Sequence, residues 1–398
     1  MSKFSDYVEL NPKVSLKKGE SVPFISMGDI TLGNRWVRPQ TTRSAGGSGS
    51  KFSPGDILFA RITPCLENGK ISQYAGEIPG LGSTEFFVLR ARKGMADPSY
   101  IYYFSQDKKF RSVAEKSMSG ASGRQRADIS ALSEYECNFP TFSIQSRIAE
   151  ILSAYDELIE NNLRRIKVLE EMARSLYREW FVNFRYPGHE SISLVGSLVG
   201  PIPKDWALKA LTECIEVKPS VVVPREGEKP FVPMGCLSND SMLISDIESR
   251  AGSSGSKFQN GDTLFARITP CLENGKTGFV QFLPNEKAVA FGSTEFIVLR
   301  SKALTPQYVY CMARSDEFRD VAIKSMTGAS GRQRVQESCF GQISITRPPQ
   351  WLLDKFTSTT EPMFRFIYKL QTQTENLRRT RDMLLPKLLS GQLTISGM

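Results

Sequence analysis

The chain carries long, nearly identical segments twice, about two hundred residues apart. The thirteen residues LFARITPCLENGK occupy positions 58–70 and return unchanged at 264–276. Two further pairs keep the same order: GSTEFFVLR (82–90) with GSTEFIVLR (292–300), and KSMSGASGRQR (116–126) with KSMTGASGRQR (324–334). Solenoid repeats are only a few tens of residues long. The spacing therefore indicates a duplicated domain, and any fold must place the same domain twice.

Each copy mixes strand and helix patterns. Short alternating runs such as DILFARI (56–62) and EFFVLR (85–90) are typical of strands, and glycine-rich or Asn-Gly turns interrupt them. Residues 97–117 and 305–325 instead have apolar residues three and four apart, with Asp97 or Thr305 near the start as a cap, so we expect helices. The sequence predicts two mixed α+β domains.

A long helical seam lies between the copies. Apolar residues recur there in steps of four and three, interrupted by one polar residue, as in a coiled coil: Ile148, Leu152, Tyr155, Ile159, Asn162, Ile166, Leu169, Ala173, Leu176 and Trp180. A helix of about 35 residues is roughly 50 Å long. That length exceeds the width of a small domain.

A second seam follows the second copy. Its apolar residues are seven apart: Phe356, Met363, Leu370, Leu377 and Leu384. Pro362 fits a first helical turn, and Pro386 is expected to end or kink the helix. Each helix could pack on its own domain. Alternatively, the two helices pack antiparallel along one another, which would relate the two halves by an approximate twofold axis.

The charge balance favours a polyanionic partner. Fifty-one Lys and Arg oppose 42 Asp and Glu, which gives a net charge of +9 and a pI near 9.1. Nucleic acid is such a partner, although a mildly basic protein without one remains the alternative. No stretch of signal-peptide type opens the sequence and no long apolar run occurs in it, so we expect a cytoplasmic protein.

Few residues suit catalysis or metal binding. The seven cysteines form no C-x-x-C pair, and His189, the one histidine, lies in the turn-like stretch FRYPGHES. Triad, Cys-His and His-metal chemistries need a placed imidazole. No G-x-x-x-x-G-K-[ST] phosphate loop is present. The sequence therefore predicts a non-enzymatic chain without a cofactor or metal of its own.

The order of these segments resembles the specificity subunit of Type I restriction-modification systems. The resemblance covers nearly the whole chain and rests on GDILFARI and GDTLFARI followed by NGK, the Gly-Arg-Gln loops, NFPTFSIQSRIAEILSAYDELIENN (138–162), GPIPKDWALKALTE (200–213) and LRRTRDMLLPKLLSGQL (377–393). It implies an α+β fold in which two long helices, packed as an antiparallel coiled coil, separate two duplicated target-recognition domains. The implied parts are recognition domain 1 (1–142), central spacer helix (143–184), linker (185–205), recognition domain 2 (206–354) and C-terminal spacer helix (355–398).

The resemblance also implies a role. Each recognition domain would read one half of a bipartite double-stranded DNA target, while two methyltransferase (modification) subunits dock on the helices and restriction/translocase subunits complete the complex. S-adenosylmethionine and ATP would belong to those partners. Two other hypotheses remain: a self-sufficient DNA methyltransferase or nuclease, and a coiled-coil assembly protein without DNA affinity. The first lacks a methyltransferase glycine motif and an Asn/Asp-Pro-Pro-aromatic motif, since RPPQW (347–351) has no preceding Asn or Asp.

Three repeated segments carry side chains suited to DNA. Base edges are recognised by Arg, Lys, Asn and Gln, and glycines let a loop approach phosphates. The candidates in the Gly-Ser loop (43–51 and 250–257) are Arg43, Ser48, Lys51, Arg250, Ser254 and Lys257. Those in the first repeat (58–70 and 264–276) are Arg61, Asn68, Lys70, Arg267, Asn274 and Lys276. Those in the Gly-Arg-Gln loop (119–126 and 327–334) are Arg124, Gln125, Arg126, Arg332, Gln333 and Arg334.

Near-identical reading loops across a twofold axis would select similar half-sites on opposite strands, so the expected target is near-palindromic. The copies differ at 33–44 against 238–250. If base readout lies in those segments instead, the half-sites could differ. Structural salt bridges and surface loops are the competing interpretation of the three shared segments.

Overall fold

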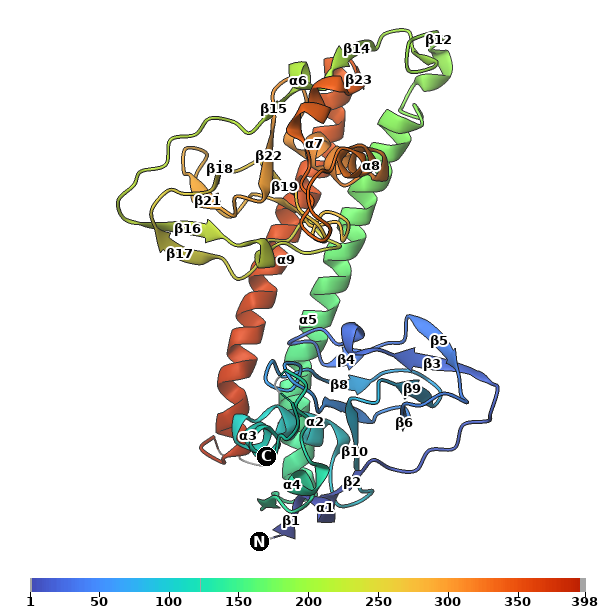
Figure 1. The fold of residues 1–398 in the computed structure, drawn as a ribbon, viewed down its shortest axis with the longest axis vertical. Helices are drawn as coiled ribbons and strands as arrows, with labels where there is room; N and C mark the ends of the chain where they lie inside the picture. The colour runs from blue at the N-terminus through green and yellow to red at the C-terminus, as the bar shows by residue number, and fades with distance from the viewer. Residues whose placement is uncertain (1, 122, 394–398) are drawn as a thin grey trace. The chain divides into compact units, whose positions relative to one another are not determined.

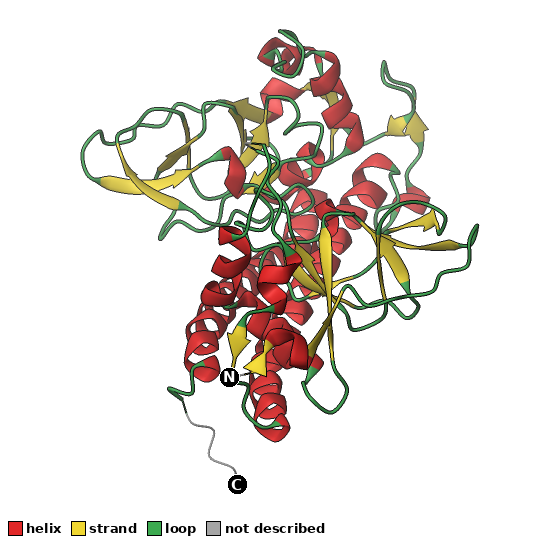
Figure 2. Ribbon diagram, turned by 60° about the horizontal axis from the view of Figure 1, so that its bottom comes forward, coloured by secondary structure: helices red, strands yellow, loops and turns green. Residues whose placement is uncertain are grey.

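The computed structural model describes residues 2–121 and 123–393. The chain divides into two compact units. The first contains residues up to Asn161 together with those from Thr374 onward, and the second runs from Asn162 to Gln373. Each unit therefore holds one copy of the duplicated domain and a part of both long helices, and its strands are joined by long loops (Figure 2).

The first unit is built on two main sheets (Figure 1). One has the order β2 (Val8–Leu10), β10 (Phe86–Ala91), β7 (Ile57–Ala60), β8 (Ile71–Tyr74) and β4 (Trp36–Val37). The other has the order β5 (Thr41–Ser44), β3 (Ser21–Ile25), β9 (Gly80–Gly82) and β6 (Ser50–Phe52). The remaining elements are β1 (Ser2–Lys3) paired with β11 (Glu136–Cys137), α1 (Phe4–Tyr7), η1 (Met27–Asp29), α2 (Pro98–Gln106), α3 (Lys108–Lys116) and α4 (Ile129–Ser133).

The second unit repeats this plan. Its sheets have the orders β15 (Ile215–Val217), β22 (Phe296–Ser301), β19 (Thr263–Ala266), β20 (Thr277–Phe279), and β17 (Glu248–Ala251), β16 (Glu228–Val232), β21 (Ala290–Gly292), β18 (Ser256–Phe258). The remaining elements are β14 (Ala207–Ala210) paired with β23 (Ser344–Arg347), β12 (Leu194–Val195) paired with β13 (Ile202–Pro203), α6 (Leu211–Cys214), α7 (Pro306–Ala313), α8 (Asp316–Lys324), η3 (His189–Ser191), η4 (Met234–Cys236) and η5 (Glu337–Gln342).

The register of the central strands is the same in both units. Phe59 on β7 pairs with Phe87 on β10, and Phe265 on β19 pairs with Ile297 on β22. Every residue of β7 and β19 is buried, which fits the continuous apolar runs of a central strand. The duplication read from the sequence is thus a duplication of the fold.

Two long helices complete the fold. α5 spans Phe142–Tyr177 and continues as a π-helical turn, η2 (Arg178–Val182), and α9 spans Gln350–Leu389. The expectation that Pro362 lies in the first turn is wrong, because α9 begins twelve residues earlier, at Gln350. Pro386 was expected to end or kink the helix, and α9 continues past it only to Leu389. An interior proline costs about 3 kcal/mol. Burial of the flanking Phe364 and Ile367, or of Leu388, stabilises by about 1.5–3 kcal/mol per side chain and offsets much of that cost.

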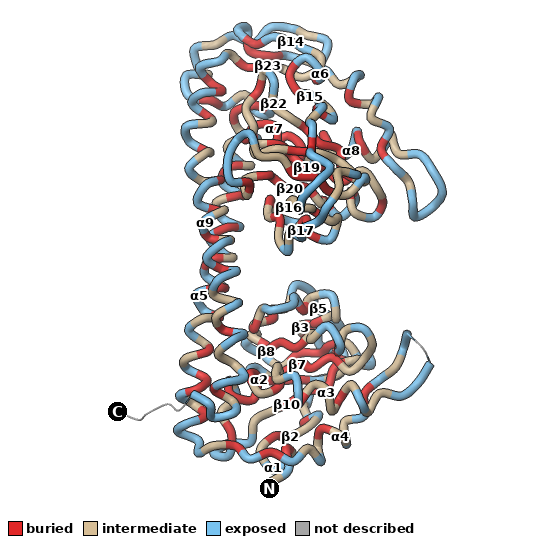
Figure 3. The backbone as a smooth tube through the Cα atoms, turned by 90° about the vertical axis from the view of Figure 1, so that its left-hand side faces the viewer, coloured by how far each residue is buried: buried red, intermediate tan, exposed pale blue. Residues whose placement is uncertain are grey.

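The two helices pack against each other in antiparallel orientation (Figures 1 and 3). In the second unit, the Asn162 amide lies 3.3 Å from Gln373 Oε1, the Arg165 guanidinium lies 5.0 Å from the Phe366 ring centroid, and the Trp180 ring contacts Phe356 at 6.1 Å. Residue numbers rise along α5 as they fall along α9. In the first unit, the Arg381 guanidinium donates to Asp156, which again pairs an earlier residue of α5 with a later residue of α9. This confirms the antiparallel arrangement.

The predicted seam residues lie between the helices and their domains. Ile148, Leu152, Ile159, Asn162, Ile166 and Leu370 are buried, whereas Tyr155, Leu169, Leu176, Met363, Leu377 and Leu384 are partly buried. In both units the helix residues also belong to the same apolar cluster as the sheet and short helices. The helices therefore pack on each other and on the domains at once.

Candidate nucleic-acid interface

The Gly-Arg-Gln loops are short hairpins of the same design. Ser119 and Arg126 exchange backbone hydrogen bonds of 3.0 and 2.9 Å, and Thr327 and Arg334 do the same. Gly120 and Gly328 have φ of +117° and +124°, a region that side chains with a Cβ rarely adopt. Glycine is therefore required for the loop to turn back, and the turn presents the residues that follow.

Within each hairpin the two arginines have different surroundings. Arg126 forms a bidentate pair with Glu85 at 2.7 Å, and Arg334 forms the same pair with Glu295 at 2.7 Å. The Arg126 guanidinium lowers the pKa of Glu85 and keeps it ionised. Arg124 and Arg332 are exposed, and no ion pair or side-chain hydrogen bond joins either of them to another described residue. These two guanidinium groups are therefore available to an external anion or base.

The neighbouring glutamines support the hairpins through their backbone. The Gln125 carbonyl accepts a hydrogen bond from the Thr63 N–H at 3.0 Å, and the Gln333 carbonyl accepts one from Thr269 at 3.1 Å. Both glutamine residues are only partly exposed. These bonds attach each hairpin to the strand-end turn of the first repeat, so the two repeated segments form one surface.

Several cations of the first repeat are used inside the domain. Lys70 Nζ donates to the Met27 carbonyl at 2.8 Å, and Lys276 Nζ donates to the Met234 carbonyl at 3.0 Å. Arg267 pairs with Glu337 at 2.7 Å. These contacts hold the segment in place. Among the candidate residues of this repeat, Asn68 and Asn274 are exposed, while Arg61 is half-buried 3.8 Å from Glu85.

The Gly-Ser loops carry an arginine stacked on an aromatic ring in each copy. The Arg43 guanidinium lies 3.7 Å from the Phe24 ring centroid, and Arg250 lies 3.9 Å from that of Phe231. In the second copy this stack lines an open hollow of about 550 Å³ together with Ser254. Ser48 lies in the loop of the first copy, and Lys51 and Lys257 lie on strands β6 and β18, which follow the loops; all three are at least partly exposed. Strands β5 and β17, which lead into the loops, are fully exposed (Figure 3).

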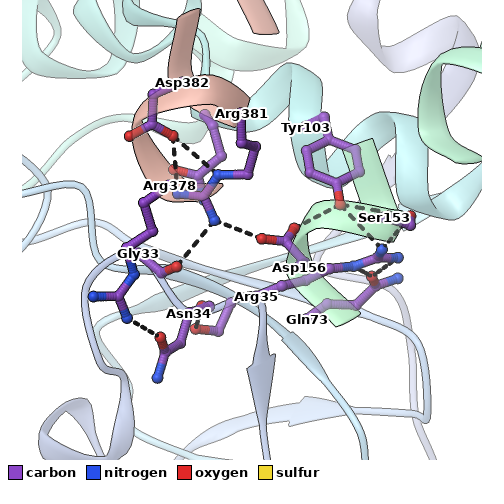
Figure 4. A network of polar contacts seen from close by, with 12 residues as sticks. Gly33, Asn34, Arg35, Gln73, Tyr103, Ser153, Asp156, Arg378, Arg381 and Asp382 are labelled. Atoms are coloured by element: carbon purple, nitrogen blue, oxygen red, sulfur yellow. Dashed lines mark hydrogen bonds and ion pairs between the residues drawn. The ribbon is translucent and has the colours of Figure 1, made fainter. Parts of the chain in front are cut away.

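Sequence patterns did not reveal a buried polar network in the first unit (Figure 4). Arg35, 4% exposed, donates to Gln73 at 2.9 Å and to Ser153 at 2.5 Å. Asp156 accepts from the Tyr103 hydroxyl at 2.6 Å and from Arg381 at 2.5 Å. The signal was present as a charged residue, Arg381, beside an otherwise apolar seam. A buried cation at such a position requires a buried partner.

A buried carboxylate occupies the corresponding place in the second unit. Glu170 on α5 accepts the backbone N–H of Met242 at 2.8 Å and the hydroxyl of Tyr310. Burial raises the pKa of Glu170 above its ordinary value, although both hydrogen bonds act in the opposite direction. The carboxyl thus binds its proton more tightly in the folded than in the unfolded chain.

This shift predicts a pH-dependent contribution to stability. A raised folded pKa stabilises fully at pH values below the unfolded pKa of about 4.5, and the contribution is lost as pH rises toward the folded pKa. Glu170→Gln removes the titration. The stability difference between E170Q and the wild type should therefore change in favour of E170Q as pH rises from about 4.5. Urea unfolding across that range measures it, with the exposed neighbour Glu171→Gln as the control; parallel profiles for E170Q and wild type would contradict the assignment.

Known proteins share the sequence pattern of this chain. Residues 9–171 match the family described as Type I restriction modification DNA specificity domain. The specificity subunit of the Type I restriction enzyme MjaIX of Methanocaldococcus jannaschii is 28% identical over 75% of this chain and 70% of its own length. The HindI specificity subunit of Haemophilus influenzae is 23% identical over 94% of both chains. The chain is therefore similar to Type I specificity subunits over most of its length.

A solved structure supports the fold of this chain. The S subunit of the Type I system from M. genitalium superposes with a TM-score of 0.53 over 97% of this chain and 95% of that chain, at 16% identity. The relatives that match the chain are specificity subunits of Type I restriction enzymes. Among residues 2–121 and 123–393 there is no cluster of metal-ligating side chains. Over the same part, no helix has the length and apolarity to cross a membrane.

Proposed function

We propose that this chain is a Type I specificity subunit and that it reads a bipartite, near-palindromic double-stranded DNA target with two similar recognition domains, residues 1–142 and 206–354. The observation that carries the proposal is the duplicated hairpin that leaves Arg124 and Arg332 exposed and without partners among the described side chains. An arginine fork donates two hydrogen bonds to guanine O6 and N7, or to phosphate. Because the hairpins are alike, they favour similar half-sites.

The remaining candidates divide by their surroundings. Arg43, Ser48, Ser254, Lys51 and Lys257, at or beside the Gly-Ser loops, suit phosphate contacts, as do Asn68 and Asn274 at the exposed turns. The cations already engaged within the domain are Lys70, Lys276, Arg61, Arg267, Arg126, Arg334 and Arg250, the last of which pairs with Glu248 at 2.6 Å. In our proposal the first group meets DNA, and the second group shapes the surface that presents it.

Duplex binding by the purified full chain tests the proposal. Neutralising phosphates releases counterions, so the logarithm of the binding constant should fall linearly with the logarithm of salt concentration. A mixture of random-sequence duplexes provides the non-specific reference, and duplexes selected from it should bind about a thousandfold or more tighter. An assembly protein without DNA affinity would show neither the salt dependence nor the selection. Methyl transfer or cleavage by the chain alone would favour the enzyme hypothesis.

We infer that the two helices dock methyltransferase subunits. α5 exposes apolar side chains that a solvated helix face does not need: Val168 and Met172 lie four residues apart and are 48% and 50% exposed. On α9, Met383 is 54% exposed. Such side chains on a surface favour a protein partner. S-adenosylmethionine and ATP belong, in this proposal, to the methyltransferase and restriction/translocase subunits.

Replacing Met172 with aspartate should weaken this docking. Docking would transfer the aspartate carboxylate from water into an apolar interface. This transfer costs about 2 kcal/mol or more, which corresponds to at least a tenfold loss of affinity. Co-purification with the methyltransferase subunit from the host measures the effect. The control is Lys167→Asp on the same helix, which places a carboxylate at a charged, exposed site. Equal recovery of the partner with M172D and wild type would contradict the assignment of this face.

A further inference from the structure

The segments that differ most between the copies are not free loops. In the first unit, the Gly33 carbonyl accepts a hydrogen bond from Arg381 at 3.0 Å, and Asn34 Oδ1 accepts one from Arg378 at 2.9 Å (Figure 4). At the end of the segment, Arg38 pairs with Glu160 on α5. Residues 33–38 are therefore bound to both long helices.

The equivalent segment of the second unit is bound to the same two helices by other groups. The Met242 N–H donates to Glu170 on α5, and the Ile244 carbonyl accepts from Gln371 on α9 at 2.7 Å. The Asn239 carbonyl accepts from Arg314 at 3.1 Å. Both divergent segments therefore meet α5 and α9, but the first uses an arginine–aspartate pair and the second a glutamate and a glutamine.

The residues that surround the two segments also differ between the copies. The Gln73 N–H donates to the Arg35 carbonyl at 2.8 Å, and the Phe279 N–H donates to the Met242 carbonyl at 3.1 Å, so Arg35 and Met242 occupy the same position. Around Arg35 lie polar groups, which include the Gln73 side chain. Met242 is buried in an apolar cluster that contains Phe279.

A third position follows the same pattern. Tyr103, whose hydroxyl contacts Asp156, is replaced by Cys311 in the otherwise matching helix start of the second copy. A buried arginine requires hydrogen-bond acceptors, whereas a methionine requires apolar neighbours. Between the copies, each divergent segment therefore changes together with the buried residues that contact it near the helices. A difference in base readout alone would not require these buried residues to change.

We propose that segments 33–38 and 238–244 position the two recognition domains on the helices, and that Asp156 with Arg381, and Glu170 with Gln371, fix the separation at which the half-sites are read. This inference rests on the proposed function. The helix residues are positioning residues, because they act through the segments they hold. The base preference of each half-site then resides in the shared, exposed hairpins and loops.

Selection from a library of random-sequence duplexes tests this inference with the full chain. The wild type should recover two half-sites separated by one gap length. Asp156→Asn and Glu170→Gln keep the side-chain shape but weaken the anchors. Both should recover the same half-site bases with a broadened distribution of gaps, so that the roughly tenfold discrimination expected against a gap changed by one base pair falls toward unity. The matched controls Glu157→Gln and Glu171→Gln, exposed residues next to each anchor, should keep the single gap.

Each other result overturns one claim. Altered half-site bases at an unchanged gap would mean that the divergent segments read DNA. Unchanged bases and gap in both anchor variants would remove the positioning role. If Asp156→Asn lowers the melting temperature below the binding temperature, Arg381→Lys takes its place with the same expectations. It keeps the cation but not the planar guanidinium whose Nη1 donates to both Gly33 and Asp156. A wild type that selects no bipartite sequence overturns the proposed function itself.

Discussion

Replacing both Arg124 and Arg332 with alanine is expected to weaken specific duplex binding by about 1–3 kcal/mol for each lost bidentate contact. Both guanidinium groups are exposed on matching hairpins, and neither has an ion-pair partner among the described residues. Two such losses in one chain would reduce affinity by roughly a factor of thirty to more than ten thousand. Titration of a selected duplex, followed by fluorescence anisotropy, measures the change.

Replacing Arg126 and Arg334 with alanine is the matched comparison. These arginines lie on the same hairpins but are paired with Glu85 and Glu295 at 2.7 Å, so part of their charge is already neutralised. We expect the second double variant to lose less affinity than the first. Equal losses, or no loss in R124A/R332A while the melting temperature stays that of the wild type, would remove Arg124 and Arg332 from the proposed surface.

Replacing Ile166 with aspartate is expected to destabilise the second unit by about 4 kcal/mol or more. Ile166 is 2% exposed and belongs to the cluster that joins α5, α9 and the second copy of the duplicated domain. The substitution removes a buried apolar side chain and places an unpaired carboxylate in the same space. Because Asn162 and Leu370 pack in the same seam, the helix pair would lose its register as well.

Val168→Asp is the control for this stability prediction. Val168 lies two residues further along α5 and is 48% exposed, so its replacement should change the free energy of unfolding by no more than about 0.5 kcal/mol in the chain without partners. Urea unfolding of both variants makes the comparison. Similar midpoints for I166D and V168D would contradict the assignment of the buried face of α5.

The sequence predicted the larger organisation because duplication and periodicity report on it directly. The repeat at 58–70 and 264–276 implied one domain used twice, and strands β7 and β19 do share their register. Steps of three and four along 148–180 implied a buried helix face. Two such faces in one chain left two interpretations open, an antiparallel helix pair or packing of each helix on its own domain, and the structure combines both.

Local sequence preferences were not enough to predict the rest of the fold. Pro362 and Pro386 looked like helix boundaries, yet α9 continues through both, since tertiary burial of neighbouring side chains outweighs a local preference. No sequence rule distinguished Lys70, whose amine donates to the Met27 carbonyl, from Arg124, whose guanidinium is exposed. Both are cations beside a glycine. Only the fold shows which of them is already occupied.

The buried anchors were hidden for a related reason. Asp156 and Glu170 look like ordinary polar residues of a solvated helix, and their burial depends on what the recognition domains place against them. Their partners, Arg381 and Met242, lie far away in the sequence. The divergence of 33–44 from 238–250 suggested different base readout, whereas the contacts of these segments connect them to the helices.

Mapping methylated bases across the host genome, with this chain present and with its gene deleted, shows whether the chain determines which DNA sequence is modified. We predict that deletion removes methylation from one bipartite sequence whose halves are near-inverted repeats at a fixed gap, and that R124A/R332A removes most of it. An unchanged methylation pattern after deletion would contradict the claim that this chain supplies the DNA specificity of a modification complex.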